Sequence, residues 1–196
     1  MKLKSAPKDQ RPKVTMETWL KPHPRFRLKK LLVPIDFSER SKKALQYALA
    51  LALEFGSELT LLHVVQPYPV IPELPVVTPE LEKMLKAEAS SELKRWQAAI
   101  RGVEAHALVR IGNPAREIAA EAASEKFDLV IITTHGRGPV ARAFLGSVAE
   151  KVVRLAPCPV LALRENENDF LVVGSDDVEL NRIAPLQQKR PMHPID

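Results

Sequence analysis

Five short apolar segments alternate with longer helical segments, and this alternation restricts the fold more than any other feature of the chain. The apolar segments are residues 29–36, 58–65, 103–112, 128–134 and 158–164, and helical spacing or capping marks residues 37–56, 78–102, 115–127 and 148–156. Strands that alternate with helices pair in parallel, because each connecting helix packs back against the sheet. The sequence therefore predicts an α/β fold, a five-stranded, doubly wound parallel sheet with helices on both faces.

Residues that favour helix ends support these boundaries. Gly56 is suited to ending the first helix, and Thr78 followed by Pro79 is suited to beginning the second, which we expect to run to about Gly102. Asn113 precedes a proline and predicts the cap of the third helix. The last helix begins at SVAE, where Ser147 and a glutamate three residues later form the pattern of a capping box.

The positive charge of the chain is concentrated at its N-terminus. Residues 1–30 hold ten basic and two acidic side chains, so the other 166 residues carry a net charge of −3. We predict a basic, disordered arm at 1–26, one domain at 27–164 and a loosely ordered tail at 165–196. The arm could contact nucleic acid or an anionic surface, and the alternative is a solvated extension without a partner.

Targeting signals and disulfides are not evident in the sequence. No apolar run approaches the ~18–20 residues that a transmembrane helix needs, and the basic N-terminus lacks an apolar secretory segment. Cys158, the only cysteine, cannot form an internal disulfide and is expected to be a small buried residue. We expect a cytoplasmic protein.

Ligands of doubly wound sheets bind at the carboxyl ends of strands where the strand order reverses, so the loops after the first, second and fourth segments are candidate sites. Asp36 follows the first segment, where its carboxylate is suited to ribose or adenine groups; the alternative is that Asp36 or Ser38 caps the next helix. Val64 could pair with an adenine edge through its backbone. His63 has no second ligand at metal-binding spacing and is expected to be an interior histidine.

The loop after the fourth segment carries the strongest signal. Gly136 and Gly138 permit sharp turns, and the helix that starts near Ser147 would offer free N–H groups to an anion, with Arg137 and Arg142 nearby. An ordinary turn into a helix explains the same residues. The loop lacks the lysine of a Walker motif, and its match to the dinucleotide pattern GxGxxG/A is weak because it follows the fourth strand.

Four segments together resemble the universal stress protein family: LLVPIDFSERSKKAL, LTLLHVV, VRIGNPAREI and THGRGPVARAFLGSVAEKVVRLAPCPVLAL. The nucleotide-binding branch of that family has Gly, two residues, Gly, nine residues and Gly-Ser or Gly-Thr. Here Gly136, Gly146 and Ser147 fill the later positions, whereas Thr133 stands at the first glycine. A threonine fits there if the backbone is extended and is strained if φ must be positive.

The resemblance implies an ATP site and a homodimer. ATP, with Mg²⁺, would contact Pro34, Asp36, Val64, Thr134, His135, Gly136, Arg137, Gly146, Ser147 and Val148. The dimer would form through the last strand, Pro159–Arg164, whose apolar edge needs a partner.

Two functions follow as expectations. The first is an ATP-binding, nucleotide-responsive regulator of the stress response, with slow hydrolysis at most because Asp36 is the only evident base. The second is a nucleotide-independent dimeric scaffold that uses its basic arm to contact a partner.

Overall fold

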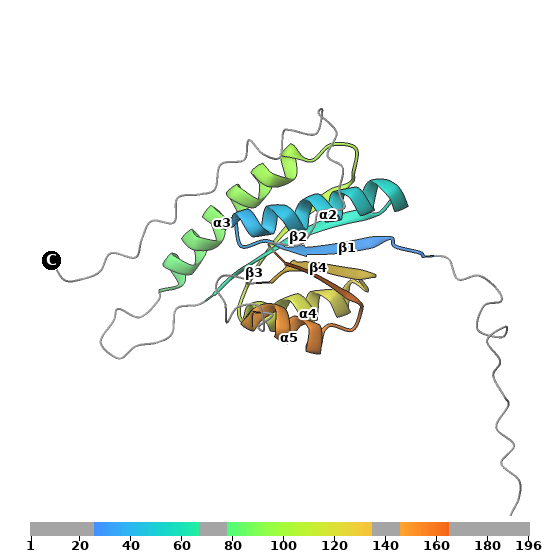
Figure 1. Cartoon of the computed structure of the whole chain (residues 1–196). Helices are drawn as coiled ribbons and strands as arrows, with labels where there is room; N and C mark the ends of the chain where they lie inside the picture. Colours follow the sequence, from blue (N-terminus) through green and yellow to red (C-terminus); the bar gives the residue numbers. More distant parts are fainter. Residues whose placement is uncertain (1–25, 67–77, 135–145, 165–196) are drawn as a thin grey trace, which may run out of the picture.

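The computed structural model describes residues 26–66, 78–134 and 146–164, and its elements are labelled as in Figure 1. The strands are β1 (Lys30–Pro34), β2 (Glu58–Val65), β3 (Ala105–Ile111), β4 (Leu129–Thr133) and β5 (Val160–Leu163), and the helices are α2 (Glu39–Phe55), α3 (Pro79–Ala99), α4 (Pro114–Ser124) and α5 (Ser147–Leu155). All neighbouring strands are parallel, in the order β3-β2-β1-β4-β5. This Rossmann-like order confirms the predicted fold class.

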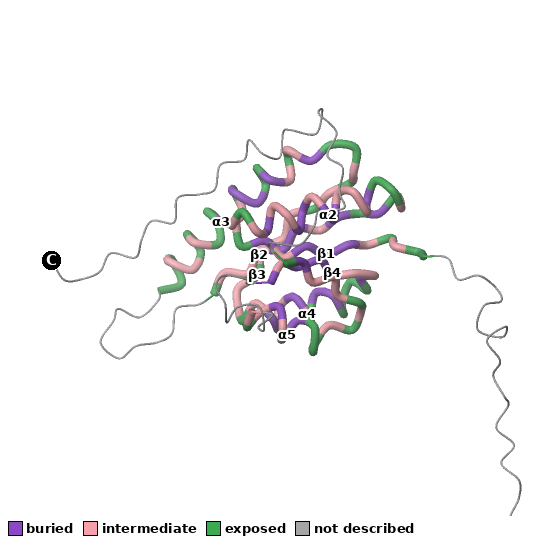
Figure 2. Tube along the Cα trace, in the orientation of Figure 1, coloured by how far each residue is buried: buried purple, intermediate pink, exposed green. Residues whose placement is uncertain are grey.

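The helices form a layer on each face of the sheet, with α2 and α3 on one side and α4 and α5 on the other (Figure 1). Successive residues of a strand point to opposite faces. Leu31 and Val33 of β1 accordingly join the apolar cluster under α2 and α3. Leu32 joins the cluster under α4 and α5. All three side chains are fully buried. The centre of the sheet is buried in the same way (purple in Figure 2). Because helices cover both faces, the strands must be apolar on both sides.

Three of the predicted helix ends are confirmed. The side chains of Thr78 and Asn113 accept hydrogen bonds from the first turns of α3 and α4. Gly56 ends α2 in a left-handed conformation, with φ of 63°, that favours glycine.

Two predicted boundaries are wrong. Helix α3 ends at Ala99, where Ile100 already has an extended backbone, rather than near Gly102. The predicted capping box at the start of α5 is also absent, because Gly146 is the N-cap and Ser147 is the first helical residue, with no side-chain cap.

The strand order reverses between β1 and β4, and these two strands stop pairing before either ends. Their ladder comprises Leu31 with Leu129 and Leu32 with Val130. The next residue of β1 that faces β4 is Pro34, because its neighbour Ile35 donates its N–H to β2. Proline has no N–H to continue a ladder. The sheet therefore opens toward its carboxyl edge at the reversal point.

Candidate functional site

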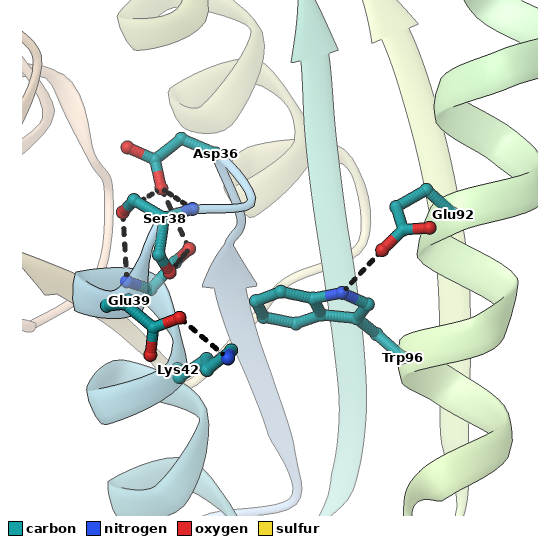
Figure 3. Close-up of polar contacts among 7 residues, drawn as sticks. Asp36, Ser38, Glu39, Lys42, Glu92 and Trp96 are labelled. Atoms are coloured by element: carbon teal, nitrogen blue, oxygen red, sulfur yellow. Dashed lines mark hydrogen bonds and ion pairs between the residues drawn. The ribbon is translucent and has the colours of Figure 1, made fainter. Parts of the chain in front are cut away.

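The turn after β1 is organised around the Asp36 carboxylate (Figure 3). Its Oδ1 accepts hydrogen bonds from the Ser38 backbone N–H at 3.0 Å, the Ser38 hydroxyl at 2.5 Å and the Ser41 hydroxyl at 2.8 Å. Ser38 is the N-cap of α2, since its hydroxyl accepts from the Ser41 N–H. Asp36 therefore holds the capping residue in place through hydrogen bonds, and is not the cap itself.

The same carboxylate keeps an oxygen for a ligand. Asp36 is an exposed residue, and within the described ranges its Oδ2 takes part in none of the hydrogen bonds. Partial burial of the carboxylate would raise its pKa, but the hydrogen bonds from Ser38 and Ser41 and the charge of Arg40 together lower the pKa below its usual value of 3.8. Asp36 is thus an anion at neutral pH, with one oxygen committed to the helix and one directed outward. The cap itself is Ser38, as the capping alternative allowed, and the outward oxygen of Asp36 stays available to a ligand.

Val64 offers backbone groups on the side of β2 that faces β1. Along β2, Leu62 accepts from Ile35 on the β1 side, and Val65 accepts from Gly112 on the β3 side. Because backbone groups alternate in direction along a strand, the N–H and C=O of Val64 point to the β1 side. Pairing with β1 ends at Leu62, so these groups lie beyond the last ladder bond. They are suited to pair with the edge of a planar base.

The amino end of α5 lies at the same edge of the sheet, because α5 connects two parallel strands and runs back along them. Gly146, the N-cap, has φ of 79° and ψ of 140°, a conformation that an L side chain rarely adopts. Ser147 and Val148 begin the helix, and among the described residues no side chain caps its first N–H groups. The other described helices are each capped by a side chain. The start of α5 can therefore accept an anion.

Thr133 and Thr134 complete the described part of the edge. Thr133 is the last residue of β4, and its φ is not positive, since Phe37 and Lys126 are the only described non-glycine residues with positive φ. Threonine in the first glycine position is thus unstrained. Thr134 is buried, and both its N–H and its hydroxyl donate to the Leu163 carbonyl, at 2.8 and 3.3 Å. These two hydrogen bonds anchor the chain to β5.

Three predicted phosphate contacts, His135, Gly136 and Arg137, lie outside the described residues.

Within the described ranges, no group of three or more His, Cys, Asp or Glu side chains could hold a metal ion. Burial raises the pKa of the half-buried Cys158 thiol, which disfavours the reactive thiolate. No helix in the described part of the chain is long and apolar enough to cross a membrane.

Sequence reasoning gave Ser38 as an alternative helix cap, which the structure confirms, but it missed Ser41 and the aromatic ring that shape the turn. The spacing of Asp36, Ser38 and Ser41 could have indicated the hydrogen-bonded cluster, because short polar side chains at a helix start bond locally. Nothing in the sequence indicated Phe37, which has a φ of 60° that is unusual for a bulky residue. Its ring stacks on His63.

Known proteins share both the sequence pattern and the fold. A profile described as the universal stress protein family matches residues 27–164. A universal stress protein of Methanocaldococcus jannaschii is 34% identical over 144 residues, which cover 72% of this chain and 85% of that protein. The solved structure of universal stress protein UspA from Lactobacillus plantarum is 28% identical, with a TM-score of 0.59, over 71% of this chain and 100% of that one.

A further solved structure, a universal stress protein in complex with cAMP, is similar in fold. It has 23% identity and a TM-score of 0.51 over 70% of this chain and 98% of that one. Since the family profile and the relatives all match the greater part of the sequence, this chain belongs to the universal stress protein family.

Proposed function

We propose that the protein binds ATP, with Mg²⁺, at the carboxyl edge of its sheet and acts in the cytoplasm as a nucleotide-responsive regulator of the stress response. The observation that carries this proposal is the amino end of α5, which begins at Gly146 without a side-chain cap beside the point where the strand order reverses. Free N–H groups at a helix start, in this place in the fold, are suited to phosphate.

The other described groups fit the remaining parts of the nucleotide. Val64 presents a backbone donor and acceptor to an adenine edge, and the outward Oδ2 of Asp36 can accept from ribose hydroxyls. Pro34 ends β1 two residues before Asp36 and lies beyond the end of the ladder to β4. The likeness to a universal stress protein solved with cAMP supports an adenine nucleotide at the level of the fold. Mg²⁺ would be held chiefly by phosphate oxygens and water, as is usual for this ion.

Within this proposal, hydrolysis is slow. A general base works best when its pKa lies near the operating pH. The pKa of Asp36 is instead lowered by its hydrogen bonds to Ser38 and Ser41, which outweigh its partial burial, so its carboxylate is a weak base. The protein would then respond to the nucleotide it holds rather than turn it over.

Titration of labelled ATP into the purified protein with Mg²⁺ tests the proposal, and the expected result is saturable binding. Gly146→Ala should weaken binding at least tenfold, because the added Cβ disfavours the N-cap conformation that presents the helix start. Gly56→Ala is the matched control, since Gly56 also has positive φ, 63°, but lies at the C-terminal end of α2 with open space around it. Absence of saturable binding by the wild type would refute the proposal.

We also propose a homodimer formed through β5. The strand order leaves β5 at one edge of the sheet, and Val160, Leu161 and Ala162 are only half-buried. Val153 and Leu155 on the adjoining α5 are exposed, at 46% and 52%. A second copy of the chain would cover both features.

The alternative is a dimeric scaffold that acts without nucleotide through its basic arm. The observation that favours it is the excess of ten basic over two acidic side chains in residues 1–30. Deletion of residues 1–25 separates the two functions. ATP affinity should be unchanged in the deletion variant if the first proposal holds, whereas a cellular phenotype that needs the arm but not Gly136 would favour the scaffold.

A further inference from the structure

His63 of β2 contacts the turn that carries Asp36. The His63 Nδ1 lies 2.7 Å from the carbonyl oxygen of Ile35. A carbonyl can only accept a hydrogen bond, so Nδ1 must carry the proton in this contact. Ile35 also donates its own N–H to the Leu62 carbonyl at 2.8 Å. Both polar backbone groups of the residue before Asp36 are thus fixed by β2.

The residue after Asp36 is held by the same imidazole. The Phe37 ring stacks on the His63 ring, with centroids 4.4 Å apart and planes inclined by 29°. Phe37 also meets the Trp96 ring edge-to-face, with centroids 5.8 Å apart. Phe37 has φ of 60°, which is unfavourable for a bulky L residue and persists only where the surroundings hold it. The ring contacts supply that restraint.

We propose that His63 is a positioning residue of the nucleotide site: by holding Ile35 with a hydrogen bond and Phe37 by stacking, it fixes Asp36 for the ligand. This inference rests on the proposed function and adds a residue that does not itself need to touch the nucleotide. Asp36 contacts Ser38 and Ser41 on the helix side, so the two sets of contacts hold the turn from opposite sides.

The charge state of the ring agrees with this role. Burial lowers the pKa of His63 below its usual 6.5, and it outweighs the opposing effects of the Ile35 carbonyl and the Asp36 charge. The ring is therefore neutral at pH 7, and its single proton is the one on Nδ1 that Ile35 requires.

Two substitutions of His63 separate the effect of its hydrogen bond to Ile35 from that of its stacking on Phe37. His63→Asn keeps an N–H donor close to the place of Nδ1 but loses the ring, whereas His63→Phe keeps a ring but leaves the Ile35 carbonyl without its donor. We expect His63→Phe to weaken ATP binding about tenfold and His63→Asn to recover most of that loss. Ser57→Ala is the control for stability alone, because it also removes a side-chain bond to a backbone carbonyl, here from the Ser57 hydroxyl to Leu28 at 2.9 Å, at the opposite edge of the sheet. Equal affinity in His63→Phe and Ser57→Ala, compared at equal folded fraction, would overturn the inference.

A second measurement does not depend on ATP. Carboxyl NMR titration gives the pKa of Asp36 in both His63 variants, which equally lack the imidazole charge. If His63 positions the turn, the pKa of Asp36 should be higher in His63→Phe than in His63→Asn, because a loosened turn weakens the bonds from Ser38 and Ser41. Identical pKa values would refute the positioning role. Failure of the wild type to bind ATP would instead refute the proposed function and leave this result interpretable.

Discussion

Substitutions of Asp36 should separate its contribution to stability, made through hydrogen bonds to Ser38 and Ser41, from its proposed contact with ATP. Asp36→Ala removes the acceptor of three hydrogen bonds from Ser38 and Ser41. Each such bond contributes about 0.5–1.5 kcal/mol net. Asp36 is exposed and water can replace part of the loss, so we expect a destabilisation of about 1–3 kcal/mol. The Ser38 cap of α2 should persist, since its hydroxyl bonds the Ser41 N–H independently.

Asp36→Asn is the sharper variant because its amide oxygen can still accept at the Oδ1 position. Its stability should fall by less than about 1 kcal/mol, since the acceptor is kept and only the charge is lost. An NH₂ group then replaces the outward Oδ2 and donates where a ribose hydroxyl would need an acceptor, so ATP affinity should fall about tenfold or more, equivalent to ~1.4 kcal/mol.

Urea unfolding at pH 7, followed by circular dichroism, measures the stability of the wild type and both variants, and ATP titration measures affinity. The folded-state pKa of Asp36 is lowered, so its stabilising effect is present above about pH 3.8 and is lost as the pH falls through the folded-state pKa. The difference between wild type and Asp36→Ala should shrink accordingly in acid. The reasoning fails if Asp36→Ala is as stable as the wild type, or if Asp36→Asn binds ATP normally.

Three further perturbations test other parts of the structure. Thr133→Gly should leave ATP affinity within about threefold, because φ at this position is not positive, and a tenfold gain in the same titration would show that threonine crowds the ligand. Arg110→Leu should destabilise the fold by about 2 kcal/mol in urea, since it leaves the buried Glu121 carboxylate without its 2.6 Å partner, and Glu121→Leu in the same chain should restore stability. Leu161→Lys should yield monomers in light scattering if β5 forms the dimer, whereas an unchanged dimer would place the interface elsewhere.

The sequence was sufficient for the fold because local and global signals agree along most of the chain. The segment Glu58–Val65 is a strand over the residues predicted, since Leu59 and Leu61 are buried on one face and Leu62 on the other. Thr78 and Asn113 cap their helices as expected, because a short polar side chain at a helix start needs only local contacts.

The site was less predictable because its geometry depends on contacts between distant segments. The capping-box pattern at Ser147 was misleading, since the backbone conformation of Gly146 moves the helix start and leaves the hydroxyl without a cap bond. The hydrogen bond from His63 to Ile35 joins two strands, and no local pattern encodes it. The positive φ of Phe37 likewise accompanies a ring contact with His63, a residue of another strand.

The short ladder between β1 and β4 has a mechanical consequence. The sheet consists of a half with β1, β2 and β3 and a half with β4 and β5, which are joined at this seam by the two residue pairs of the ladder and by hydrogen bonds of Asp128 with Lys29 and Lys30 at the amino end. Toward the carboxyl edge, where these bonds have ended, side-chain packing holds the halves together, including that of α2, which contacts both β1 and β4. A molecule bound where the ladder has ended would contact both halves and link them. Without it, this part of the sheet would lack that link, and relative motion of the halves would be easiest there.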